Sequence, residues 1–190
     1  MRLSNFYSLK SVGAMGVANL VGSSISAFFW MYIAAILGAE NYGELGYYIS
    51  IAGLATSLSF IGGPMAITVL VAKKYNIEST IYLVSIFASI ISALVLYFAF
   101  TNIGMSVYVL GSVIYNLASS ELLGRKFYKK YSIYFISQKI LFILFSLLFY
   151  YLIGPEGILI GIGLSFLLFT KRIYRGFKDT PLNFQLLKTK

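Results

Sequence analysis

The chain has 190 residues, of which 59% are hydrophobic and only 11% are charged, and its mean hydropathy is +0.84. A soluble domain carries roughly a quarter charged residues, and a nucleic-acid-binding domain gathers its basic residues on one water-exposed face, so neither class fits this chain. Membrane lipids are the expected partners of its net charge of +9. With no Cys, no His and six acidic residues, the chain is not expected to be an enzyme or to hold a metal or cofactor.

Residues 12–122 contain enough apolar sequence for four membrane crossings, because about 20 residues span the hydrocarbon core of a bilayer. One helix is predicted at about residues 12–37, and a second at about 45–72. The stretch from 79 to 120 is uncharged and about twice as long as one crossing requires. Its turn-forming residues at 101–104 divide it into helices at about 79–100 and 105–122.

The rest of the chain adds two predicted helices and a basic end. A fifth helix is predicted at about 132–153, where Gly154 and Pro155 end it, and a shorter sixth at about 157–170. The sequence therefore predicts an all-α, polytopic membrane protein, with a six-helix lobe over residues 1–170 and a basic cytoplasmic tail over 171–190.

The orientation is predicted from the basic residues in the loops, which are enriched on the cytoplasmic side of membrane proteins. Lys and Arg occur before the first helix and after the second, fourth and sixth. The only charged residues in the alternate loops are Glu40, Glu44 and Glu156. This asymmetry predicts a multi-pass protein of the cell membrane with both termini in the cytoplasm.

The loop between the first two predicted helices reads Leu37-Gly38-Ala39-Glu40-Asn41-Tyr42-Gly43-Glu44-Leu45, and the second helix contains Leu58-Ser59-Phe60-Ile61-Gly62. These segments resemble the amino-terminal part of the polysaccharide-biosynthesis flippases, the Wzx-type exporters of the MOP superfamily, whose pattern here is roughly L-G-x-E-x-Y/F-G-x-L. The resemblance extends to the order and orientation of all six helices. It covers about half of a family member, because these transporters have two lobes around a central cavity.

The resemblance implies that the chain translocates a lipid-linked oligosaccharide across the membrane, as one lobe that works with a second lobe or a second copy. An alternative in the same superfamily is a MATE-like exporter of small molecules, which needs a carboxylate inside the membrane for ion coupling. A second alternative is a non-transporting membrane subunit or assembly factor.

Two features of the first two helices have structural interpretations as well as functional ones. Gly38 is expected to end the first helix in a left-handed conformation, and Asn41 to cap the second helix with Glu44 in a capping box. Gly62, Gly63 and Pro64 interrupt the second helix, so a kink is expected, either as a hinge or as a purely structural bend.

Lys139 is the strongest single candidate for substrate binding. It is predicted to lie roughly 10 Å along the fifth helix, where an ammonium group is costly unless it meets water, a partner or an anionic ligand. The substrates of the resembled family carry a lipid pyrophosphate that Lys139 would bind; alternatively, its side chain snorkels to the headgroups.

Polar residues on single helix faces are weaker candidates. They either pack helices together or line a wet cavity, and Glu121 with Arg125 is expected to form a local ion pair. The candidate substrate-binding residues among them are Asn19, Ser23, Thr56, Ser57 and Asn116.

Overall fold

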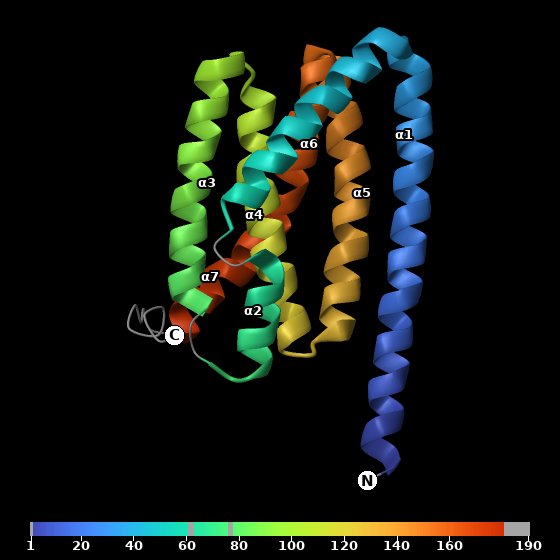
Figure 1. The fold of residues 1–190 in the computed structure, drawn as a ribbon. Helices are drawn as coiled ribbons and strands as arrows, with labels where there is room; N and C mark the ends of the chain where they lie inside the picture. The colour runs from blue at the N-terminus through green and yellow to red at the C-terminus, as the bar shows by residue number, and fades with distance from the viewer. Residues whose placement is uncertain (1, 61–62, 76–77, 181–190) are drawn as a thin grey trace.

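The computed structural model describes residues 2–60, 63–75 and 78–180, and every regular element among them is helical (Figure 1). The elements are α1 (Arg2–Leu58), α2 (Gly63–Ala72), α3 (Glu78–Phe100), α4 (Ile103–Gly124), α5 (Tyr128–Ile153), α6 (Pro155–Ser165), the 3₁₀ helix η1 (Phe166–Phe169) and α7 (Thr170–Asp179). Five of the described segments are long and apolar enough to cross a membrane. The protein is a polytopic helical membrane protein, as the composition predicts.

The longest span, Val12–Leu58, is two helical segments joined at Gly38. Gly38 has φ 72° and ψ 174°, so this one residue reverses the chain and the second segment begins at once. The expected loop before a helix at 45 is therefore wrong. The capping box is wrong too: Asn41 donates its amide to the Leu37 carbonyl at 3.2 Å, and Glu44 accepts from the Tyr48 hydroxyl at 2.8 Å.

The return path is interrupted where the sequence predicts a kink. α1 ends at Leu58 and α2 begins at Gly63, with Pro64 in its first turn, where the missing N–H costs nothing. Ser59 Oγ lies 3.0 Å from Ser92 Oγ of α3, which ties the interruption to the neighbouring helix. Gly62 lies outside the described residues, and a hinge at Gly62, Gly63 and Pro64 stays a prediction.

The third, fourth and fifth helices lie close to the predicted ranges. Asn102 caps α4 by accepting from the Met105 amide at 3.1 Å, which explains why the turn at 101–104 divides the long apolar stretch. α5 begins at Tyr128, four residues before the expected start at 132. Gly154, with φ 85°, connects α5 to α6.

The sixth helix extends beyond its predicted end at 170. The chain continues through η1 into α7, so residues 171–179 of the predicted basic tail are helical. α7 buries Ile173 and Gly176, and Ser79 Oγ of α3 donates to the Gly176 carbonyl at 3.0 Å. The basic residues of this segment made it resemble a solvated tail. Its small and apolar residues, Ile173 and Gly176, nevertheless pack on the bundle. Residues 181–190 lie outside the described residues.

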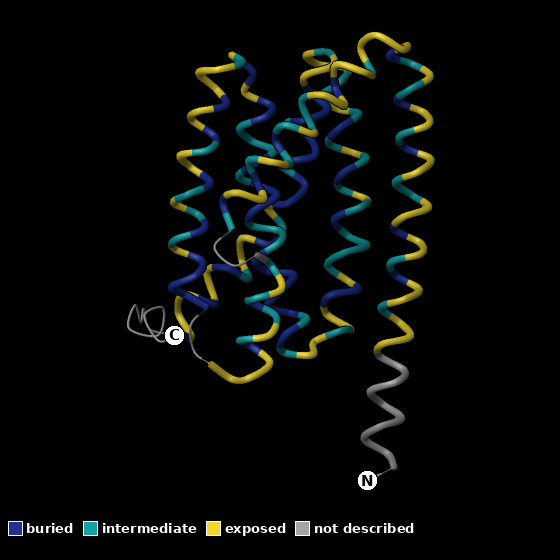
Figure 2. The backbone as a smooth tube through the Cα atoms, in the orientation of Figure 1, coloured by how far each residue is buried: buried dark blue, intermediate teal, exposed yellow. Residues whose placement is uncertain are grey.

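α4 and α6 form the centre of the bundle, and their tubes are largely buried in Figure 2. Val109, Val113 and Leu117 of α4 are completely buried, and aromatic contacts such as Phe29 with Phe142, 4.4 Å between ring centroids, join α1 to α5. A Cβ atom on Gly161 would collide with the backbone of α5 at Ser146. The small residues of the sixth helix therefore serve close packing.

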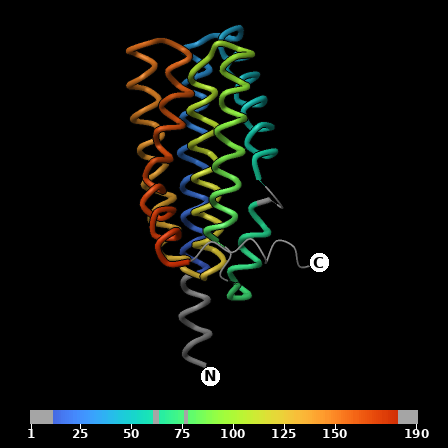
Figure 3. Tube along the Cα trace, turned by 90° about the vertical axis from the view of Figure 1, so that its left-hand side faces the viewer, coloured from blue at the N-terminus to red at the C-terminus, as the bar shows by residue number. Residues whose placement is uncertain are grey.

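The basic residues of the described loops gather at one end of the bundle. The end of α2, the α4–α5 connection and α7 lie together there, opposite the bend in α1 and the α3–α4 and α5–α6 connections (Figures 1 and 3). The segments carry Lys73, Lys74, Arg125, Lys126, Lys129, Lys130, Lys171, Arg172, Arg175 and Lys178. The loop-charge pattern thus corresponds to two ends of one helical bundle.

Candidate functional site

Lys139, near the middle of α5, lines a cavity of about 220 Å³. Both segments of α1, together with α4, α5, α6 and η1, contribute to its wall. The polar and aromatic residues that line the cavity with Lys139 are Ser26, Trp30, Tyr108, Tyr115, Gln138, Phe142 and Phe166. Because these residues come from distant parts of the sequence, the cavity depends on the fold of the whole bundle.

The Lys139 ammonium lies between two aromatic rings. Its Nζ atom is 5.3 Å from the ring centroid of Phe135 and 5.5 Å from that of Phe142, both within the range of cation–π attraction. No salt bridge to Lys139 occurs among the described residues. Since α5 begins at Tyr128, Lys139 lies about 16 Å along it at 1.5 Å per residue, deeper than the sequence predicts.

The other candidate binding residues do not line this cavity. Thr56 and Ser57 donate to the carbonyls of Ala52 and Gly53 at 2.8 and 3.0 Å, and the Asn116 amide donates to the Ser112 carbonyl at 2.8 Å. These local bonds to the preceding turn use the polar groups within their own helices. Asn19 is half-buried and Ser23 is exposed on α1. Their role in binding substrate stays a prediction.

Sequence analysis missed Gln138, which precedes Lys139 and is nearly fully buried. Its amide donates to Ser165 Oγ at 3.0 Å, and Ser165 donates to the Ile162 carbonyl at 2.6 Å. A Gln–Lys pair within an apolar helix was the available signal. The cavity therefore combines a cation, an amide, hydroxyl groups and aromatic faces, a set that can bind a polar or anionic molecule.

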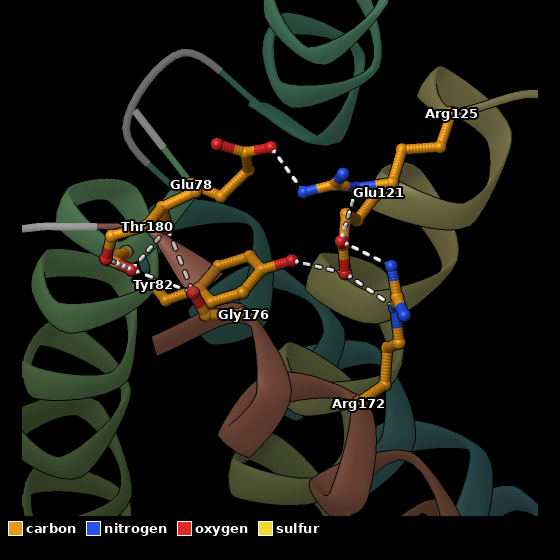
Figure 4. A network of polar contacts seen from close by, with 8 residues as sticks. Glu78, Tyr82, Glu121, Arg125, Arg172, Gly176 and Thr180 are labelled. Carbon is orange, nitrogen blue, oxygen red and sulfur yellow. Dashed lines mark hydrogen bonds and ion pairs between the residues drawn. The ribbon is translucent and has the colours of Figure 1, made fainter. Parts of the chain in front are cut away.

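A second polar cluster lies at the basic end of the bundle, where four charged side chains from three helices meet (Figure 4). Glu121 of α4 accepts from Arg125 Nε at 2.7 Å and from Arg172 Nη2 at 2.6 Å. Arg125 also donates to Glu78 of α3 at 2.9 Å, and the Tyr82 hydroxyl donates to Glu121 at 2.9 Å. The predicted Glu121–Arg125 pair is confirmed as part of this larger network.

The network explains how three helix ends are held together. The side chains of Glu78 and Glu121 are 3% and 1% exposed, and two arginines balance their two negative charges. Beside the network, Gly176 allows α7 to approach Tyr82, because a Cβ atom there would meet the tyrosine ring. The arrangement fixes α3, α4 and α7 relative to one another.

Comparisons with family models, curated proteins and solved structures give no match for this chain. A function for this chain therefore has to be inferred from the arrangement of its residues.

Proposed function

We propose that this chain is one lobe of a Wzx-like exporter that translocates a lipid-linked oligosaccharide across the cell membrane, with its basic end in the cytoplasm. The observation that carries the proposal is Lys139, a cation near the middle of a membrane-spanning helix that lines a cavity and has no carboxylate partner among the described residues. A charge at such depth typically marks a substrate pathway. The resemblance of the first helical hairpin to polysaccharide flippases supports the choice of substrate class.

The chemistry of the cavity wall suits a phosphorylated sugar. Lys139 would attract a phosphate, Gln138 and Ser26 offer hydrogen bonds to hydroxyl groups, and aromatic side chains such as Trp30 present faces on which a sugar ring can stack. The volume of about 220 Å³ is smaller than the roughly 300–1,000 Å³ of a typical ligand site. A second lobe or second copy is therefore proposed to complete the binding surface.

The MATE-like alternative receives less support from the structure. Glu78 and Glu121, the two acids buried in the described part of the chain, are each paired with an arginine. Carboxylates held in this way are poorly suited to exchange a coupling ion, because an ion would have to compete with a bound arginine for each carboxylate.

The test is export of a lipid-linked glycan by Lys139 variants in cells that depend on this chain. Lys139→Ala should lower the rate of export and cause lipid-linked precursor to accumulate, while the amount of protein in the membrane is unchanged. Lys139→Arg should retain partial export, since its charge survives although its shape differs. Lys129→Ala, which removes an exposed charge from the same helix, is the matched control. Normal export by Lys139→Ala would contradict the proposal.

A further inference from the structure

A second cavity, of about 530 Å³, lies at the basic end of the bundle between the last turns of α2 and α4. It shares no lining residue with the Lys139 cavity. Its charged lining residues are Lys74, Glu78, Arg125 and Lys126, and Val71 and Phe127 add apolar surface. A polar cavity at the end of membrane-spanning helices lies at the depth of lipid headgroups.

The cavity carries an excess of positive charge. Glu78, Glu121, Arg125 and Arg172 bond one another, so their four charges cancel. Lys74 and Lys126 then remain, and no acidic group lies within 4.0 Å of either among the described residues. Their two positive charges match a ligand group that carries one or two negative charges.

The backbone at the two lysines is an independent observation. Lys74 has φ 61° and Lys126 has φ 59°, in the left-handed region that disfavours a side chain. Each is the second residue after the end of its helix, Ala72 of α2 or Gly124 of α4, a position that commonly selects glycine. The third non-glycine residue with positive φ in the described chain, Thr101, lies at the opposite end of the bundle.

The two helix ends also share one hydrogen-bond pattern. Lys74 donates its amide to the Val71 carbonyl at 3.0 Å, and Lys126 donates its amide to the Leu123 carbonyl at 2.9 Å. The residues that follow, Tyr75 and Phe127, close the same six-residue ring onto Leu70 and Leu122. Glycine would serve this motif better, so the lysine side chains point to a role other than ending a helix.

We propose that this cavity binds the phosphate of an anionic phospholipid from the surrounding bilayer. Lys74 and Lys126 contact the phosphate oxygens, and Arg125, whose side chain is 31% exposed, adds a third donor while it stays bonded to Glu78. Phe127, 40% exposed, faces the first carbons of the lipid chains. The inference is independent of Lys139 and of the exported molecule.

Native mass spectrometry of the purified chain tests the proposal with phosphatidylglycerol, phosphatidylcholine and inorganic phosphate as probes. Wild-type protein should retain one phosphatidylglycerol in preference to phosphatidylcholine, and excess inorganic phosphate should not displace it. Removing one lysine charge should weaken retention roughly fivefold, corresponding to about 1 kcal/mol per lysine. Lys74→Gln with Lys126→Gln should therefore weaken it by more than tenfold.

The matched control is Lys73→Gln with Lys129→Gln, which removes two exposed charges, one beside Lys74 and one from the first turn of α5, but none from the cavity wall. Equal loss in this control, equal retention of phosphatidylcholine, or displacement by inorganic phosphate would overturn the proposal. A second variant separates binding from folding: Lys74→Gly with Lys126→Gly should keep or raise the unfolding temperature while losing phosphatidylglycerol. A fall in unfolding temperature with retention unchanged would assign the lysines a purely structural role.

Discussion

Glu121 receives three hydrogen-bonding side chains in a position that is closed to solvent. Tyr82, Arg125 and Arg172 all donate to its two oxygen atoms, and each comes from a different place in the sequence. A buried carboxylate is costly by itself, and the arginines offset that cost only while all partners stay in place. Loss of the carboxylate would leave two guanidinium groups close together with one anion, Glu78, near them.

Glu121→Ala is therefore expected to destabilise the folded protein strongly. Removing one partner from a buried ion pair costs about 3–5 kcal/mol, because the remaining charge is left uncompensated. Thermal unfolding in detergent should show a much lower midpoint for Glu121→Ala than for wild type. Glu40→Ala, which removes an exposed acid, should change stability by no more than about 0.5 kcal/mol. Similar midpoints for both variants would contradict a structural role for the network.

Part of each polar site was predictable from the sequence. Glu121 and Arg125 are four residues apart on one helix, and Lys139 is a charge within an apolar run, so local spacing was enough to identify them. Arg172 lies 51 residues from Glu121, and Arg125 lies 47 residues from Glu78. No periodicity relates positions that far apart, so these ion pairs depend on the tertiary arrangement of the helices and cannot be predicted from local spacing.

Helix contacts in the second half of the chain depend on the absence of side chains. Cβ atoms on Gly111 and Gly163 would collide with the backbone of the facing helix, so α4 and α6 approach closely at these positions. Gly161 has the same role between α6 and α5. Other glycines, such as Gly16 of α1, have open space where a Cβ would lie. Glycines that look alike in sequence thus have opposite roles.

Gly161→Ala and Gly16→Ala are expected to change stability in opposite directions. At Gly161 the added methyl group would overlap the α5 backbone, and overpacking typically costs about 1–3 kcal/mol. At Gly16 nothing is displaced, and alanine in a helix interior is favoured over glycine by roughly 0.5–1 kcal/mol. Unfolding midpoints measured side by side provide the check. Gly161→Ala with a midpoint at or above that of wild type would show that α5 and α6 can separate without loss.

Element boundaries were predictable where the apolar runs end at recognisable turn residues. Asn102 and Gly154 ended the third and fifth helices close to the expected places. The predicted loop in the first hairpin was wrong because residues 40–44 are polar, as loop residues usually are. Gly38 alone reverses the chain, and residues 40–44 are helical. The helix at 171–179 was not predicted, because α7 buries only a narrow face, with Ile173 and Gly176, and most of its other residues are charged.

At the scale of the whole molecule, the concentration of basic residues at one end predicts how the bundle sits in a membrane. Cysteine labelling is available because the chain has no native Cys. An impermeant thiol reagent applied outside intact cells should label single cysteines introduced at Asn41, Thr101 and Glu156. It should not label cysteines at Lys73, Lys129 and Lys178 until the cells are opened. All six positions are exposed, so burial does not explain a failure to react. Labelling of Lys73→Cys or Lys129→Cys in sealed cells would reverse the proposed orientation.

The proposed two-lobe mechanism predicts that the chain does not act alone. Ser23 and Ser57 are exposed on the two segments of α1, and the Lys139 cavity is small for a complete site. A partner would provide hydrogen bonds worth roughly 0.6–2 kcal/mol each between helices in lipid. In mild detergent, light scattering should therefore show a dimer, or another membrane protein should co-purify. Ser57→Trp should weaken this association, whereas Leu94→Trp, at an exposed position of α3, should not. A monodisperse monomer that translocates a lipid-linked sugar in liposomes would refute the mechanism, because no second surface would then close the cavity around its substrate.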